Sequence, residues 1–77
     1  MKIIEKIHGE IKSLVFKDVS NDTSLIKSGL LDSISVVDLV IFIEEETGLK
    51  IPENHIIEEN FDSIDNIKSY LSKRTED

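Results

Sequence analysis

The residues in this sequence that could do chemistry are few, and the most informative one is a serine. Asp32-Ser33 directly precedes a strongly apolar segment. A serine hydroxyl can attack a substrate when a neighbouring base activates it, or it can carry a covalently attached group. No histidine or lysine is predicted beside Ser33, and His8 and His55 stand alone without the spacing of metal ligands. We therefore predict no catalytic residues, no metal site and no enzymatic activity.

A purely structural role for the same pair is the simpler interpretation. Serine and aspartate are both preferred N-cap residues, and an acid at that position interacts favourably with the helix dipole. Ser35 is a rival acceptor for a modification, but it lies inside the predicted helix. The residue types alone leave both a plain cap and a modified Ser33 open.

The pair would be positioned by a helix that starts at Asp32 or Ser33. This helix should run to about Thr47, and Gly48 then supplies the left-handed residue that ends it. An earlier helix is predicted by apolar residues spaced by three and four, namely Ile3, Ile4, Ile7, Ile11, Leu14 and Val15. We expect His8 to be solvated on the polar flank of that helix.

The connections between these helices also carry signals. Residues 17–31 predict a long loop, and loops of this length tend to be functional. Its apolar residues should hold it on the core: Leu25, Ile26, Leu30 and Leu31. After Pro52, residues 53–59 should form a short helical turn. Asp62 or Ser63 should cap a last helix, which leaves residues 73–77 as a polar tail.

These elements together predict an all-α fold. We expect a small four-helix bundle of three main helices plus one short helix, with the long loop between the first two, as a single domain over residues 1–77. The chain has no cysteine, so apolar packing must stabilise it. We expect the aromatic residues in the core or at its edge: Phe16, Phe42, Phe61 and Tyr70.

The second helix is more apolar than one buried face requires. Eight of the ten residues from Ile34 to Ile43 are aliphatic or aromatic. At 100° per residue, one arc forms the expected core face: Val36, Leu39, Val40 and Ile43. The opposite arc contains Ile34, Val37 and Ile41 together with Asp38 and Glu45. This second stripe is either a docking face for a partner or buried on a central helix, and its acids favour docking.

The net charge of −7 is concentrated in the middle of the chain. Residues 32–62 contain nine acids against Lys50 alone. Glu44, Glu45 and Glu46 are either a solvated face or, because acids near a helix C-terminus are mildly unfavourable, an indication of a further use. The negative charge disfavours nucleic acid and favours partners with basic patches. No apolar run is long enough to span a membrane, and the amino-terminal residues do not resemble a signal peptide. We expect a cytoplasmic monomer.

The segment Gly29-Leu30-Leu31-Asp32-Ser33-Ile34, with the acidic helix after it, resembles the acyl and peptidyl carrier protein family. The resemblance covers nearly the whole chain. It includes the chain length, the long first loop and Lys50-Ile51-Pro52 after the second helix. It implies that a phosphopantetheinyl transferase attaches 4'-phosphopantetheine from coenzyme A to Ser33, whose arm then carries an acyl or aminoacyl thioester. Asp32 would assist the transferase.

The same resemblance implies a docking face for partner enzymes on the second helix. Its residues are Ile34, Val37, Asp38, Ile41 and Glu45. Leu30 and Leu31 both separate Gly29 from Asp32, where many members have one residue, and Ser35-Val36 also departs from the fatty-acid type. These differences suggest a stand-alone carrier for a dedicated biosynthetic pathway. Its partners would be an acyl- or aminoacyl-adenylating ligase and downstream acyl-handling enzymes. The alternative is an unmodified acidic helical adaptor or dimerisation module.

Overall fold

The computed structural model describes residues 2–75, and all of its regular elements are helical. The main helices are α1 (Lys2–Val15), α2 (Ser33–Thr47) and α4 (Ile64–Thr75). A single-turn 3-10 helix, η1 (Glu53–His55), and a short helix, α3 (Glu58–Phe61), lie between α2 and α4. The predicted all-α bundle with three main helices and a long loop after the first is therefore confirmed.

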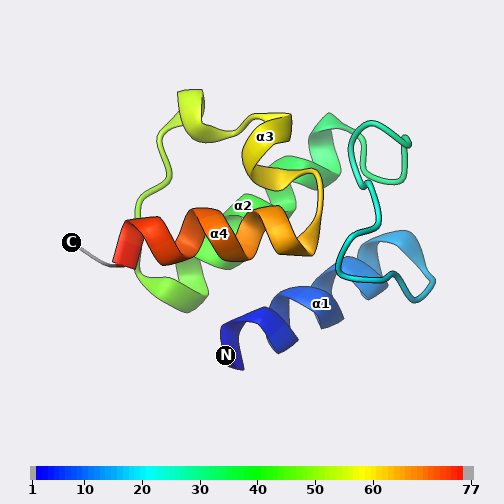
Figure 1. The fold of residues 1–77 in the computed structure, drawn as a ribbon, viewed down its shortest axis with the longest axis horizontal. Coiled ribbons are helices and arrows are strands. Elements are labelled where there is room, and N and C mark those ends of the chain that lie inside the picture. The colour runs from blue at the N-terminus through cyan, green and yellow to red at the C-terminus, as the bar shows by residue number, and fades with distance from the viewer. Residues whose placement is uncertain (1, 76–77) are drawn as a thin grey trace.

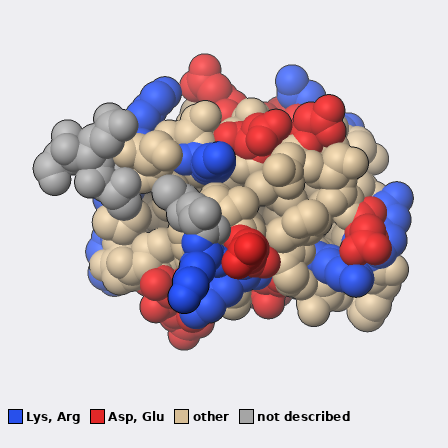
Figure 2. Space-filling model, turned by 60° about the horizontal axis from the view of Figure 1, so that its bottom comes forward, with Lys and Arg blue, Asp and Glu red and all other residues tan. Residues whose placement is uncertain are grey.

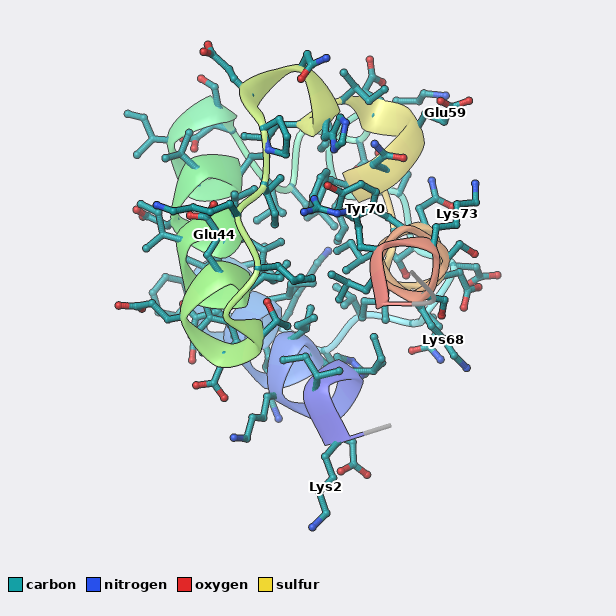
Figure 3. All side chains as sticks on the ribbon, turned by 90° about the vertical axis from the view of Figure 1, so that its left-hand side faces the viewer. Lys2, Glu44, Glu59, Lys68, Tyr70 and Lys73 are labelled. Atoms are coloured by element: carbon teal, nitrogen blue, oxygen red, sulfur yellow. The ribbon has the colours of Figure 1, made fainter. Side chains whose placement is uncertain are left out.

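The three main helices enclose one core. In Figure 1, α2 and α4 run back towards the end of the molecule at which α1 begins. Viewed along the bundle in Figure 3, side chains from α1, α2 and α4 fill the space between the helices, and α3 covers the upper side. The largest fully buried side chains of the core come from the four α-helices and from the long loop. They are Ile7, Ile11, Leu25, Leu39, Ile43, Phe61, Ile64 and Ile67.

Local signals set both ends of α2 where the sequence predicted. Asp32 is the N-cap, and its carboxylate accepts a hydrogen bond of 2.8 Å from the Ser35 N–H. Gly48 follows Thr47 at φ 75°, and its N–H donates to the Glu44 carbonyl. Glycine adopts this conformation without the steric penalty of a Cβ. The predicted start and end of the site-bearing helix are therefore confirmed.

The long loop is held on the core as predicted, although by more than apolar contacts. Leu25 and Leu31 are buried, and Ile26 and Leu30 are half-buried. The Asp62 carboxylate accepts hydrogen bonds from the Ser24 hydroxyl and from the Ile26 and Lys27 N–H groups. Asp62 therefore fixes the loop. Of the two predicted cap residues, Ser63 is the one that caps α4, because its hydroxyl accepts a hydrogen bond from the Asn66 N–H.

Several smaller predictions were wrong. The short helical turn predicted over residues 53–59 is divided between η1 and the start of α3. The polar tail predicted from residue 73 is helical through Lys73 and Arg74, because α4 continues to Thr75, and residues 76–77 lie outside the described part. Phe16 is 91% exposed, because it follows the last residue of α1 at φ 59°, where the chain turns away from the core. His8 is half-buried, and its Nε2 lies 2.7 Å from the Val19 carbonyl.

The described part of the chain contains no candidate membrane-spanning helix and no candidate cluster of metal-binding side chains. Within residues 2–75, no helix is long and apolar enough to cross a membrane. No group of three His, Asp or Glu side chains in that same range is arranged to hold a metal ion.

Candidate functional site

Ser33 is the first residue of α2, and its side chain is exposed. No residue in the described part of the chain forms a hydrogen bond with its hydroxyl. Ser35, the rival acceptor, is half-buried within the first turn and is tied to Asp32 through its N–H. Of the two hydroxyls, Ser33 is the one that another enzyme can reach without disturbing the cap of the helix.

Asp32 performs the capping role and stays charged. The hydrogen bond from the Ser35 N–H is the largest cause that lowers the pKa of Asp32 below its ordinary value, and the Ser35 side chain adds to it. Because the carboxylate occupies the Ser35 N–H, a phosphate on Ser33 cannot use that donor without displacing Asp32.

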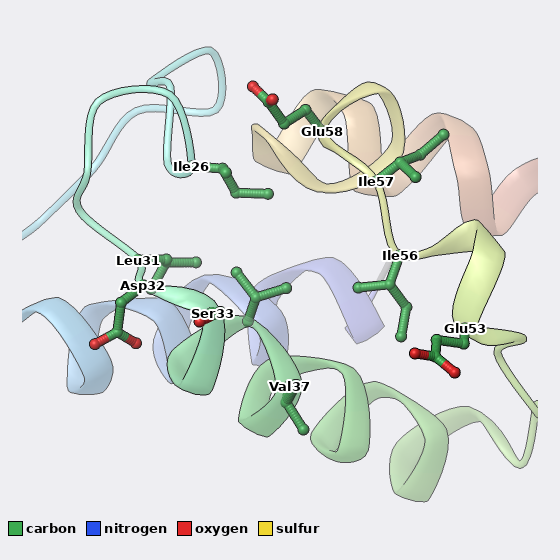
Figure 4. Close-up of a pocket in the computed structure, with 10 residues that line it drawn as sticks. Ile26, Leu31, Asp32, Ser33, Val37, Glu53, Ile56, Ile57 and Glu58 are labelled. Atoms are coloured by element: carbon green, nitrogen blue, oxygen red, sulfur yellow. The ribbon is translucent and has the colours of Figure 1, made fainter.

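Ser33 lies at the edge of an open groove of about 620 Å³. The walls come from three separate segments, as Figure 4 shows: Ile26 and Leu31 from the loop, Ser33 and Val37 from α2, and Ile56 and Ile57 from the opposite side. The Asp32 carboxylate points away from the wall made by Ile56 and Ile57. An exposed hydroxyl beside an apolar groove fits a flexible arm that carries an acyl group, since the groove can shelter apolar atoms near the attachment point.

The second apolar stripe of α2 faces outward. Ile34 is 73%, Val37 49% and Ile41 47% exposed, so burial on a central helix is excluded as its explanation. Asp38 and Glu45 are also exposed, at helical spacing from Ile34 and Ile41. All five residues of the predicted docking face therefore lie on the surface of α2, where Val37 also reaches the groove.

Of the three consecutive acids Glu44, Glu45 and Glu46, the first and the last make contacts within the protein. The Glu44 carboxylate accepts a hydrogen bond of 2.8 Å from the Ile51 N–H, and Figure 3 shows Glu44 directed at the chain that leaves α2. Glu46 pairs with Lys6 of α1 at 2.8 Å. Glu45 and Glu46 are exposed, whereas Glu44 is half-buried.

The far wall of the groove is formed by residues that the sequence patterns did not predict. Ile56 and Ile57 were not singled out, although two adjacent isoleucines in an acidic segment were a usable signal. The sequence patterns also predicted His55 to be isolated, whereas His55 Nδ1 lies 2.8 Å from the Tyr70 hydroxyl. That contact joins residues fifteen positions apart and has no local signature.

Comparison with known proteins agrees with this geometry. Residues 3–71 match a family described as "Phosphopantetheine attachment site". A curated relative from Bdellovibrio bacteriovorus, named acyl carrier protein, is 28% identical over 75 residues, which cover 88% of this chain and 94% of that protein. The matched range contains the whole of α2, the groove and all but the end of α4.

Proposed function

Because the chain belongs to the phosphopantetheine attachment family, we propose that Ser33 is the residue that carries the arm. Members of this family are carriers rather than enzymes, and they hold a covalently attached 4'-phosphopantetheine. The observation that supports Ser33 most directly is its exposed, unbonded hydroxyl at the start of α2, beside an apolar groove. The thiol of the arm supplies the thioester chemistry, and the chain's own residues hold, shelter and present the cargo.

The attachment itself is a phosphoryl-type transfer for which coenzyme A is the co-substrate. The Ser33 hydroxyl oxygen attacks phosphorus, a phosphodiester bond forms, and adenosine 3',5'-bisphosphate leaves. The hydroxyl proton goes to the transferase, because no histidine or lysine flanks Ser33 in the sequence and the Asp32 carboxylate already accepts from the Ser35 N–H. Asp32 directly precedes Ser33 and keeps its charge, and we assign it the role of assisting the transferase.

Carrier proteins interact with phosphopantetheinyl transferases and acyl-handling enzymes. For this chain, we propose that they dock on the exposed face of α2, with apolar contacts to Ile34, Val37 and Ile41 and basic groups opposite Asp38 and Glu45. The exposure of this stripe and its acidic flanks support that arrangement, because complementary charge speeds encounter and selects partners.

The pathway is also part of the proposal. We propose a stand-alone carrier, one domain over residues 1–77, that acts as a monomer in the cytoplasm, where coenzyme A is available. An adenylating ligase would load it with an acyl or aminoacyl group for a dedicated biosynthetic route. The two leucines between Gly29 and Asp32 support this choice over general fatty-acid synthesis.

The deciding experiment is intact-protein mass spectrometry after incubation with coenzyme A and a broad-specificity phosphopantetheinyl transferase. The wild type and Ser35→Ala should each gain one arm, whereas Ser33→Ala should gain none. Ser35→Ala is the matched control, because it removes a hydroxyl from the same helical turn. Modification of Ser33→Ala would refute the site, and no addition to the folded wild type would favour the adaptor hypothesis.

A further inference from the structure

We propose that Tyr70 and Arg74 of α4 are positioning residues that hold the groove wall formed by Ile56 and Ile57. The inference rests on the proposed function insofar as this wall shelters a thioester carried on Ser33. The hydrogen bonds themselves are independent of that function, so the two claims can fail separately.

The wall segment is anchored only partly by apolar packing, because Ile56 lies half-buried against the core whereas most of the segment is exposed. None of residues 52–60 is fully buried, and Ile57 is 44% exposed. The nearest buried residues are Ile51 before the segment and Phe61 after it. Apolar contacts hold the two ends of the segment and Ile56, and polar contacts hold His55 directly before Ile56.

Those polar contacts converge on one tyrosine. The Tyr70 hydroxyl lies 2.8 Å from His55 Nδ1, and Arg74 Nη1 donates to the same hydroxyl at 2.8 Å. Arg74 Nη2 donates to the Lys50 carbonyl at 2.8 Å, which fixes the chain just before the segment. Figure 3 shows Tyr70 between α4 and the segment above it. Tyr70 is also buried against Phe61, with ring centroids 5.4 Å apart, so its hydroxyl is held in place.

The role of Arg74 is fixed, because a guanidinium can only donate, so the Tyr70 oxygen accepts from it. In the contact with His55 Nδ1, the donor depends on the tautomer of the imidazole. The Asn60 side chain donates to the His55 carbonyl at 2.9 Å and completes the attachment. Removal of the Tyr70 hydroxyl therefore breaks two contacts at once, and one of them holds the side chain of His55, which directly precedes Ile56.

Amide hydrogen exchange of the unmodified protein tests the positioning claim. The N–H groups of His55, Ile56 and Ile57 bond to the carbonyls of Pro52, Glu53 and His55, so their exchange reports opening of the wall. Tyr70→Phe should speed their exchange by about fivefold, the size expected for loss of the one hydrogen bond that joins Tyr70 to this segment, at His55. Amides of α2 should be unchanged. Ser69→Ala, which removes an exposed hydroxyl from the adjacent position, should have no effect.

Thioester hydrolysis tests the sheltering claim. The probes are octanoyl and acetyl arms, transferred from octanoyl- and acetyl-coenzyme A. Tyr70→Phe should hydrolyse its octanoyl thioester faster than the wild type, whereas the acetyl thioester should be unaffected because a two-carbon chain has little apolar surface to shelter. Arg74→Ala should act in the same direction.

Each contrary result overturns a distinct claim. Unchanged exchange at residues 55–57, or an equal rise across α2, would refute the positioning role. Equal acceleration of both thioesters, or of neither, would refute sheltering by this wall. Absence of the arm from Ser33 in the mass spectrum would refute the proposed function, while the exchange experiment would still decide the role of Tyr70.

Discussion

At the scale of single residues, the first turn of α2 divides two tasks between neighbours. Asp32 caps the helix through the Ser35 N–H and stays charged, whereas Ser33 keeps a free hydroxyl on the surface. A capping side chain is normally satisfied by the backbone and unavailable for reaction. The presence of a separate cap therefore explains how Ser33 can be modified without unravelling its own helix.

The charge and the capping bond of Asp32 can be separated experimentally. Asp32→Asn keeps an N-cap oxygen and should melt close to the wild type, whereas Asp32→Ala loses the cap and should melt at a lower temperature. If the carboxylate assists the transferase, both variants should be modified more slowly at equal concentration. Normal modification rates in Asp32→Asn would remove that role from Asp32 and leave only the cap.

Asp62 is a second aspartate whose charge is used structurally. Partial burial on its own would raise the pKa of Asp62, but hydrogen bonds from the Lys27 and Ile26 N–H groups and the Ser24 hydroxyl outweigh it, so the pKa is lowered. Asp62→Ala leaves those two N–H groups without this acceptor and should reduce the free energy of unfolding by about 2 kcal/mol at neutral pH. Urea denaturation measures this, with Asp22→Ala on the exposed loop surface as control.

The same lowered pKa predicts a pH dependence with a definite sign. A carboxylate whose pKa is depressed in the folded state adds stability above its unfolded pKa, about 3.9 for aspartate. That contribution is lost as the pH falls through the lower, folded value. The difference in unfolding free energy between wild type and Asp62→Ala should therefore be constant at neutral pH and shrink below about pH 4. A difference independent of pH down to acid unfolding would contradict it.

At the scale of elements, α2 has a buried and an exposed apolar face, and substitutions on the two faces should affect stability differently. Ile43 is fully buried, so Ile43→Ala should reduce the free energy of unfolding by about 2–5 kcal/mol. Ile41, two residues earlier, is 47% exposed, and Ile41→Ser should change stability by no more than about 0.5 kcal/mol. If the outer face docks partners, Ile41→Ser should nevertheless raise the KM of the transferase. An unchanged KM would remove Ile41 from the docking face.

The end of α1 contains an unusual residue that predicts a stabilising substitution. Phe16 adopts φ 59° with its side chain almost wholly in water, so it has the steric cost of a left-handed residue without the gain from burial. Phe16→Gly should raise the free energy of unfolding by up to about 1 kcal/mol, as glycine at this position is the usual helix ending. Lower stability in thermal melts would mean that the phenyl ring packs on the protein.

At the scale of the whole molecule, charge is unevenly distributed. The face in Figure 2 carries acidic and basic side chains interspersed over a largely uncharged surface. The excess negative charge belongs instead to residues 32–62, which contain nine acids and one lysine. Such a segment repels itself while it attracts basic partners, so the property that favours docking also opposes folding.

Salt should therefore stabilise this protein. Added salt shortens the range of repulsion to about 10 Å at 0.1 M ionic strength. The melting temperature should rise between low and moderate salt concentration, because screening relieves repulsion among the exposed acids more than it weakens the surface Lys6–Glu46 and Lys12–Asp18 pairs. A flat or falling melting temperature would show that these ion pairs outweigh the repulsion.

The sequence by itself determined what depends on neighbours within a few positions. The apolar spacing of α1, α2 and α4, the cap at Asp32, the ending at Gly48 and the outward stripe of α2 follow from residues three or four apart, because a helix brings those residues onto one face. These local signals also identified Ser33 as the candidate attachment residue and carried the resemblance that the family match confirmed.

Tertiary structure alone decided the contacts between distant segments. Asp62 with the loop at residues 24–27, His8 with Val19, and His55 with Tyr70 join residues that no periodicity relates. The groove beside Ser33 likewise exists only because the loop, α2 and Ile56–Ile57 converge in space. Local spacing decides which face a residue occupies, but the group that faces it depends on how the helices pack, and a single sequence does not encode that locally.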